Sequence, residues 1–167
     1  TTTAANLALA YREIVRGGRV LLLEANVRRP SLAKLFGFDP PVCFLEQLKR
    51  HKDDPNEPWI AVEQIAPLHV MAVDPNATRE ETLLDPVAFS IAMDRLSLAG
   101  YDYIVIDTPS ILEGADVNLM TESVEGILLS TRSALTTEKA LRRAIEQLGP
   151  VTVFGAVMLD VPASSTG

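Results

Sequence analysis

Three threonines, Thr1 to Thr3, open a segment whose apolar residues recur at helical spacing until two glycines end it. Their hydroxyls could hold a phosphate or a metal ion, because the N-terminus of a helix presents unpaired N–H groups and favours an anion. A phosphate-binding loop also ends in a Ser or Thr hydroxyl that reaches Mg²⁺, after a glycine-rich turn and a lysine. Only the hydroxyl end of such a loop is present here. Plain N-capping of a helix by threonine is the alternative.

Two carboxylates stand at the ends of short apolar runs. Glu24 ends the run that begins at Arg19, and Asp107 ends the run that begins at Tyr103. Functional carboxylates of an open α/β sheet lie at the carboxyl ends of its strands. A carboxylate leaving a buried strand requires a cation, a hydrogen-bond donor or a Mg²⁺-bound water. We therefore interpret Asp107 as a Mg²⁺-associated group rather than a solvated carboxylate.

A basic pair, Arg28 and Arg29, follows Glu24 and precedes Pro30. Such a pair could contact a phosphate or a subunit interface. Arginines after a strand are also often solvated or paired with nearby acids, and both interpretations stay open.

The composition excludes several classes of protein. The 167 residues carry a net charge of −7, which makes nucleic acid an unsuitable partner. No apolar stretch approaches the roughly 18 residues that cross a bilayer. A lone cysteine, Cys43, and two histidines provide neither an internal disulfide nor a metal-ligand cluster, which agrees with a reducing, cytoplasmic setting. No signal peptide is visible in this sequence.

Apolar runs alternate with helical patterns along the chain, which predicts βαβ units and a mostly parallel sheet covered by helices on both faces. We expect strands at 19–24, 68–73, 103–107, 126–131 and 151–159. Between the later runs, one helical stripe includes Phe89, Met93 and Leu96, and another runs from Ala140 to Leu148.

The region 38–67 differs, because it contains four prolines and a charged run. We expect a short helix at Cys43–Lys49 and an exposed loop at Asp53–Pro58. Residues 1–161 are predicted to form a single α/β domain, and residues 162–167 a flexible tail.

Three segments together resemble the bacterial tyrosine kinases, cytoplasmic ATPase modules of exopolysaccharide biosynthesis within the MinD/ParA-like group of deviant P-loop ATPases. The resemblance rests on Thr1–Ala8, Val20–Gly37 and Tyr101–Pro109, and it covers most of the chain. The stretch Arg-Arg-Pro-Ser-Leu at 28–32, followed by Leu-Phe-Gly at 35–37, favours these kinases over the partitioning ATPases. The implied fold is that of a P-loop NTPase of the MinD/ParA type.

The resemblance implies specific roles, with ATP or ADP and Mg²⁺ as cofactors. Thr1 would ligate Mg²⁺, Thr2 would lie beside the phosphates, and Asp107 would be the Walker B acid. Glu24 would be catalytic in the second acidic motif, where Asn26 and Arg28 would contact the nucleotide. Asp160 would lie near the base, where related ATPases commonly carry asparagine.

The chain departs from the family at several of these positions. Glu24 and Asn26 replace two aspartates, and an amide can neither accept a proton nor supply a full negative charge. The glycine-rich turn and the lysine of the P-loop are not among the 167 residues of this sequence. The family autophosphorylates on a tyrosine-rich tail, whereas the 167 residues contain only Tyr11, Tyr101 and Tyr103, which we expect to be structural.

In P-loop folds a strand precedes the loop, and the resemblance places it in the middle of the sheet. Without it, buried backbone groups would lack partners. We therefore expect the gene product to extend upstream of Thr1.

These observations predict a nucleotide-binding domain with weak or lost kinase catalysis, acting as a regulatory pseudo-kinase. The resemblance implies that the partner is a membrane-embedded polysaccharide chain-length or export protein. It places the domain at the inner face of the membrane. It is also compatible with assembly of the domain into a homo-oligomer. The alternatives are a positioning ATPase of the MinD/ParA type and an interaction module that no longer binds nucleotide.

Overall fold

A computed structural model describes residues 1–77, 84–114 and 116–160. The chain divides into two compact units, Thr1–Pro109 and Ser110–Gly167, and each is described by itself. The single domain 1–161 stays a prediction. The tail predicted at 162–167 lies outside the described residues.

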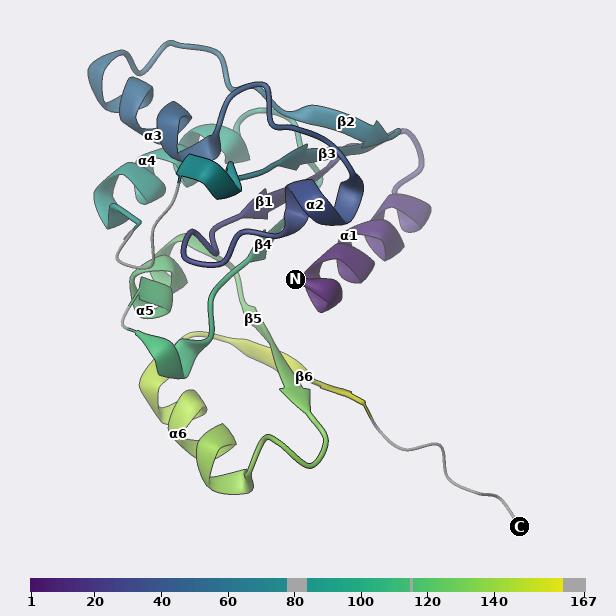
Figure 1. The fold of residues 1–167 in the computed structure, drawn as a ribbon, viewed down its shortest axis with the longest axis vertical. Coiled ribbons are helices and arrows are strands. Elements are labelled where there is room, and N and C mark those ends of the chain that lie inside the picture. The colour runs from purple at the N-terminus through teal and green to yellow at the C-terminus, as the bar shows by residue number, and fades with distance from the viewer. Residues whose placement is uncertain (78–83, 115, 161–167) are drawn as a thin grey trace. The chain divides into compact units, whose positions relative to one another are not determined.

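The first unit contains a four-stranded sheet in the order β2-β3-β1-β4 (Figure 1). Strand β1 (Val20–Glu24) is parallel to β3 (Leu68–Met71) on one side and to β4 (Tyr103–Asp107) on the other, as predicted. Strand β2 (Val62–Ile65) pairs antiparallel with β3. All five residues of β1 are buried, which explains why this strand is a continuous apolar run.

Helices cover both faces of this sheet. The first unit contains α1 (Thr2–Ile14), α2 (Leu32–Phe36), α3 (Phe44–Asp53), α4 (Pro86–Ser97) and a 3₁₀ turn at Pro75–Ala77. On one face, buried residues of α1 and α2 pack against Val20 and Leu22. Leu21 and Leu23 point to the opposite face by strand alternation and are also fully buried, so neither face of β1 meets solvent.

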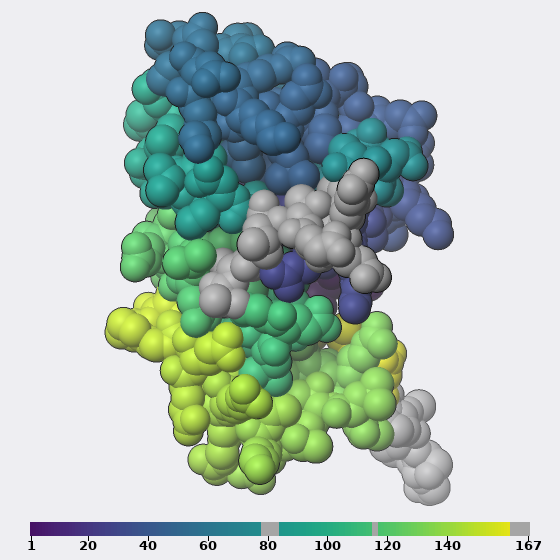
Figure 2. All heavy atoms as spheres, turned by 60° about the vertical axis from the view of Figure 1, so that its left-hand side comes forward, coloured from purple at the N-terminus to yellow at the C-terminus, as the bar shows by residue number. Residues whose placement is uncertain are grey.

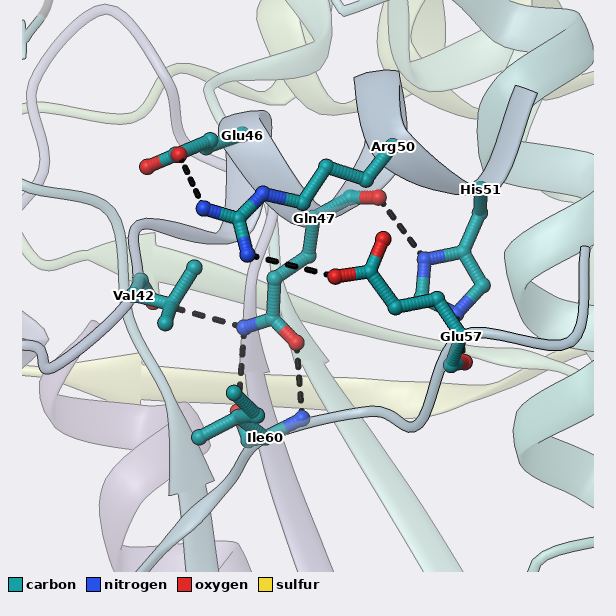
Figure 3. Close-up of polar contacts among 7 residues, drawn as sticks. All are labelled: Val42, Glu46, Gln47, Arg50, His51, Glu57 and Ile60. Carbon is teal, nitrogen blue, oxygen red and sulfur yellow. Dashed lines mark hydrogen bonds and ion pairs between the residues drawn. The ribbon is translucent and has the colours of Figure 1, made fainter. Parts of the chain in front are cut away.

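Helix α3 is longer than the segment Cys43–Lys49 that we expected, because the charged run continues the helix. The imidazole of His51 contacts two backbone carbonyls, with Nδ1 2.8 Å from Gln47 O (Figure 3) and Nε2 2.6 Å from Glu57 O. The ring also stacks on Trp59 at a centroid distance of 3.6 Å. These contacts bury the His51 side chain within the charged run.

The loop after α3 is attached to the helix by the side chain of Gln47. Its Oε1 accepts from Ile60 N at 2.7 Å, and its Nε2 donates to Ile60 O at 3.0 Å and to Val42 O at 3.3 Å. Arg50 adds ion pairs with Glu46 and Glu57 at the surface. Figure 2 shows the α3 segment, in blue, on the outside of the first unit.

Two elements of the first unit were not predicted. Helix α2 has only five residues, too few for a periodic pattern. Strand β2 alternates partly buried and exposed positions, and its sequence Val-Glu-Gln-Ile has only two apolar residues. Its antiparallel pairing with β3 is the exception to an otherwise parallel sheet.

The second unit is a βαβ arrangement of β5 (Ile127–Arg132), α6 (Glu138–Leu148) and β6 (Val153–Leu159), whose two strands are parallel. Thr137 caps α6 by accepting a hydrogen bond from Ala140 N at 3.1 Å, and the helix ends before Gly149, whose φ is 69°. The short helix α5 (Asp116–Met120) and two 3₁₀ turns, Ile111–Glu113 and Thr121–Ser123, precede β5.

The described strands form two separate sheets. Within the described ranges, β4 pairs only with β1, and β5 pairs only with β6. The parallel strands and covering helices are those of the predicted α/β class.

Candidate functional site

The hydroxyl of Thr1 meets the carboxylate of Asp107 at the edge of the first unit's sheet. Thr1 Oγ1 donates to Asp107 Oδ2 at 2.5 Å, and the Thr1 nitrogen lies 2.9 Å from Asp107 Oδ1. Thr1 holds the N-cap position of α1, yet its side chain makes no capping hydrogen bond. The capping alternative therefore does not describe this hydroxyl, which is directed to the strand-end carboxylate instead.

Strand register brings the two predicted acids together. Glu24 pairs with Asp107 as neighbouring parallel strands β1 and β4 end, and Ala25 N donates to Asp107 O at 2.8 Å. Both side chains are buried, with Glu24 0% and Asp107 3% exposed. The carboxyl ends of the parallel strands thus form the edge that sequence patterning predicted.

The carboxylate of Glu24 accepts hydrogen bonds from three backbone N–H groups. Its Oε1 accepts from Ser31 N at 2.5 Å and from Leu32 N at 2.8 Å, and its Oε2 accepts from Val73 N at 3.0 Å. Burial raises the pKa of the Glu24 carboxyl above its ordinary value of 4.5, the three backbone donors oppose that rise, and the neighbouring Asp107 adds to it. Glu24 therefore joins three backbone segments of the unit.

Ser31 belongs to the same cluster, and sequence reasoning did not single it out as a site residue. Its Oγ lies 2.8 Å from Thr1 Oγ1. Ser31 holds the N-cap position of α2 and, like Thr1, makes no capping hydrogen bond with its side chain. The available signal was its place in the quoted stretch after Arg28 and Arg29.

The remaining residues predicted to bind nucleotide are Thr2, Asn26, Arg28 and Asp160. Thr2 lies in the first turn of α1 and is exposed, and Asn26 and Arg28 follow β1 and are partly buried. Asp160 belongs to the second unit, where its exposed carboxylate lies 3.7 Å from Arg132 Nε. Its role near an adenine base stays a prediction.

The groups around Thr1 fit a magnesium ion that is shared with phosphates. Mg²⁺ in such sites uses one or two carboxylates, with water and substrate phosphates completing its octahedron. Asp107 supplies a buried carboxylate, and Thr1 a hydroxyl with a free lone pair. No cluster of three or more His, Cys, Asp or Glu occurs among the described residues. A metal ion at Thr1 and Asp107 would therefore need water and phosphate oxygens as further ligands.

Comparison with known proteins identifies relatives along nearly the whole chain. No protein-family model matches it. The tyrosine-protein kinase YwqD of Bacillus subtilis is 29% identical over 163 residues, which cover 95% of this chain and 65% of YwqD. Bacterial tyrosine kinases are among the homologues of this chain. The chain spans only 20% and 19% of the length of two other matching tyrosine kinases.

Solved structures of tyrosine kinase domains share the fold. The kinase domain of the Escherichia coli tyrosine kinase ETK superposes with a TM-score of 0.72 at 21% identity, covering 98% of this chain and 64% of that domain. The MinC:MinD cell division complex of Aquifex aeolicus gives a TM-score of 0.68 at 17% identity, covering 93% of this chain and 60% of that one. The fold is therefore that of tyrosine kinase domains and MinD/ParA-type ATPases.

The three tyrosines of this tyrosine kinase homologue all take part in ring contacts. Tyr11 and Tyr103 stack at a centroid distance of 4.0 Å, joining α1 to β4. Tyr101 Oη lies 2.9 Å from His69 Nδ1, and the guanidinium of Arg19 lies over the Tyr101 ring. Burial raises the pKa of Tyr101 above its ordinary value of 10.0, and the Arg19 charge opposes that rise. These contacts agree with the structural role expected for the tyrosines.

Among the described residues, the structure has no helix that is both long enough and apolar enough to span a bilayer.

Proposed function

We propose that this chain is a Mg²⁺-nucleotide-binding domain similar to a bacterial tyrosine kinase, with weak or lost catalysis and a regulatory role. The observation that carries the proposal is the 2.5 Å hydrogen bond from Thr1 Oγ1 to Asp107 Oδ2. It supports the assignment of Thr1 as the P-loop hydroxyl and Asp107 as the Walker B acid, because the hydroxyl donates to the acid and keeps a lone pair for the ion.

The environment of Glu24 supports weak catalysis. A general base must reach the proton that it removes. The Glu24 carboxylate is fully buried and already accepts three backbone hydrogen bonds, so a substrate hydroxyl could reach it only if the surrounding structure rearranged. Asn26 follows it with an amide, which cannot act as a base. Phosphoryl transfer relies on positioning and charge neutralisation, and the expected loss in rate is orders of magnitude.

We also propose, from the tyrosine kinase resemblance, that the domain acts in exopolysaccharide biosynthesis. There it would work at the inner face of the membrane, with a membrane-embedded chain-length or export protein as its partner. Arg28 and Arg29, after β1, are the residues we assign to a phosphate or a subunit contact.

The test of weak catalysis is a phosphotyrosine assay on the gene product with Mg-ATP. We expect no phosphotyrosine above the level of an Asp107→Asn variant. Robust phosphotyrosine in the unaltered protein, abolished by Asp107→Asn, would overturn the pseudo-kinase proposal and leave nucleotide binding in place.

The MinD-like fold favours one other candidate, an ATPase that switches between monomer and dimer. ATP-dependent dimerisation without phosphotyrosine, measured by light scattering, distinguishes it from a tyrosine kinase. Absence of any Mg-ADP binding would leave only an interaction module.

A further inference from the structure

The two hydroxyls beside Asp107 form a directed chain of hydrogen bonds. A threonine hydroxyl has one proton and two lone pairs. The proton of Thr1 goes to Asp107 Oδ2, so the 2.8 Å contact between Thr1 Oγ1 and Ser31 Oγ requires Ser31 to donate. The direction therefore runs from Ser31 to Thr1 to Asp107.

The hydrogen bonds with Ser31 and Asp107 occupy every bonding site of the Thr1 hydroxyl except one. Its proton is given to Asp107, and one lone pair accepts from Ser31. One lone pair remains, and its direction is set by the other two bonds. Without Ser31, the hydroxyl would still donate to Asp107, but either lone pair could turn outward.

Glu24 fixes the position of Ser31 through the backbone. Ser31 N and the next amide, Leu32 N, both donate to Glu24 Oε1, and the other oxygen of Glu24 holds Val73 N. The Ser31 carbonyl is also occupied, because it accepts from Leu35 N at 2.9 Å in the first turn of α2. With the backbone held on both sides, the Ser31 hydroxyl is directed to Thr1 and not to its own helix.

We propose that Ser31 is a positioning residue, which orients the Thr1 hydroxyl so that a single lone pair faces the metal ion, and that Glu24 acts through Ser31. The proposal rests on the proposed Mg²⁺-nucleotide binding and assigns to this chain's own serine a part in it. Glu24 thereby contributes to the site without contacting the ion or a substrate.

The experiment measures ADP affinity by calorimetry, with Mg²⁺ and with EDTA, for the gene product and its Ser31→Ala variant. The quantity compared is the ratio of the two affinities, which reports the metal ion separately from the nucleotide. We expect Ser31→Ala to reduce this ratio by about threefold to tenfold, the factor for one hydrogen bond, with metal-free ADP affinity unchanged. Ser31→Thr keeps a hydroxyl and should keep the ratio.

Two controls separate positioning from folding. Ser97→Ala removes an exposed serine hydroxyl that bonds only its own helix, at Asp94 O, and should change nothing. The melting temperature without nucleotide is recorded for all variants. If Ser31→Ala lowers that temperature, the comparison of Ser31→Thr with the unaltered protein still tests the role of the hydroxyl.

The outcomes are distinct. An unchanged Mg²⁺ ratio in Ser31→Ala, or a ratio lost in a folded Ser31→Thr variant, would overturn the positioning role and leave the proposed function standing. Absence of any Mg²⁺ effect on ADP binding by the unaltered protein would overturn the proposed function, and the role of Ser31 with it.

Discussion

Thr1 Oγ1 donates a hydrogen bond of 2.5 Å to Asp107 Oδ2, although 106 positions separate the two residues in the chain. The first turn of α1 and the carboxyl end of β4 must therefore be fixed relative to each other. Helix α1 lies against β4, and the Tyr11–Tyr103 stack joins the same two elements. The contact is thus built into the packing of the first unit.

We predict that Glu24→Asp destabilises the protein and does not restore kinase activity. The shorter side chain cannot reach Val73 N while still accepting from Ser31 N and Leu32 N. Leaving one buried N–H without a partner should lower the free energy of unfolding by about 1–3 kcal/mol, measured in urea.

The matched control is Glu125→Asp, because the Glu125 side chain is exposed. This substitution should leave the free energy of unfolding unaltered. A Glu24→Asp variant that is as stable as the unaltered protein, or that gains phosphotyrosine, would contradict a structural role for Glu24.

The raised pKa of Glu24 predicts a pH dependence of stability. Below the ordinary pKa of 4.5 the carboxyl is protonated in both folded and unfolded chains. As pH rises through the folded pKa, the unfolded chain has already ionised, and the folded protein must ionise a buried group. The contribution of Glu24 to stability is therefore largest at low pH and falls as pH rises.

Glu24→Gln removes this titration. Urea unfolding at several pH values between about 4 and 7 should show that the stability of the unaltered protein relative to Glu24→Gln declines with rising pH. A relative stability that increases with pH would mean that the backbone donors outweigh burial and that the folded pKa is lowered.

We predict that Gln47→Ala loosens the loop after α3. The variant loses three hydrogen bonds of a buried side chain and leaves Ile60 N without its acceptor. The expected loss is about 1–3 kcal/mol. Faster amide hydrogen exchange at Ile60, measured by mass spectrometry, is the direct sign.

The control is Glu46→Ala, which removes a surface ion pair with Arg50 and should not change that exchange. Equal exchange in both variants would contradict the role of Gln47.

The sequence predicted the parts of the fold that depend on continuous apolar runs. Strands β1 and β4 and their terminal acids, Glu24 and Asp107, were found because both strands are continuous apolar runs, although β1 is buried along its whole length and β4 only in part. Helix α3 was predicted too short, because its charged last turn is held by His51 contacts that involve residues after the helix. Strand β2 is short and half exposed, and a local pattern gives it no clear signal.

The candidate site was predicted in part for similar reasons. Residue type and position singled out Thr1 and Asp107, and resemblance assigned their roles. The sequence could not reveal that the Glu24 carboxylate accepts from three backbone N–H groups, because two of the donors, Ser31 N and Val73 N, come from separate loops. The place of Ser31 beside Thr1 also depends on tertiary packing.

The central claim, that Thr1 and Asp107 form a Mg²⁺-nucleotide site, is tested most directly by ADP calorimetry on the gene product. We predict that Mg²⁺ increases ADP affinity in the unaltered protein and in the exposed control Asp94→Asn. The increase should be lost in Asp107→Asn, whose amide lacks the charge that the ion requires. An equal Mg²⁺ effect in Asp107→Asn, or none in the unaltered protein, would contradict the account.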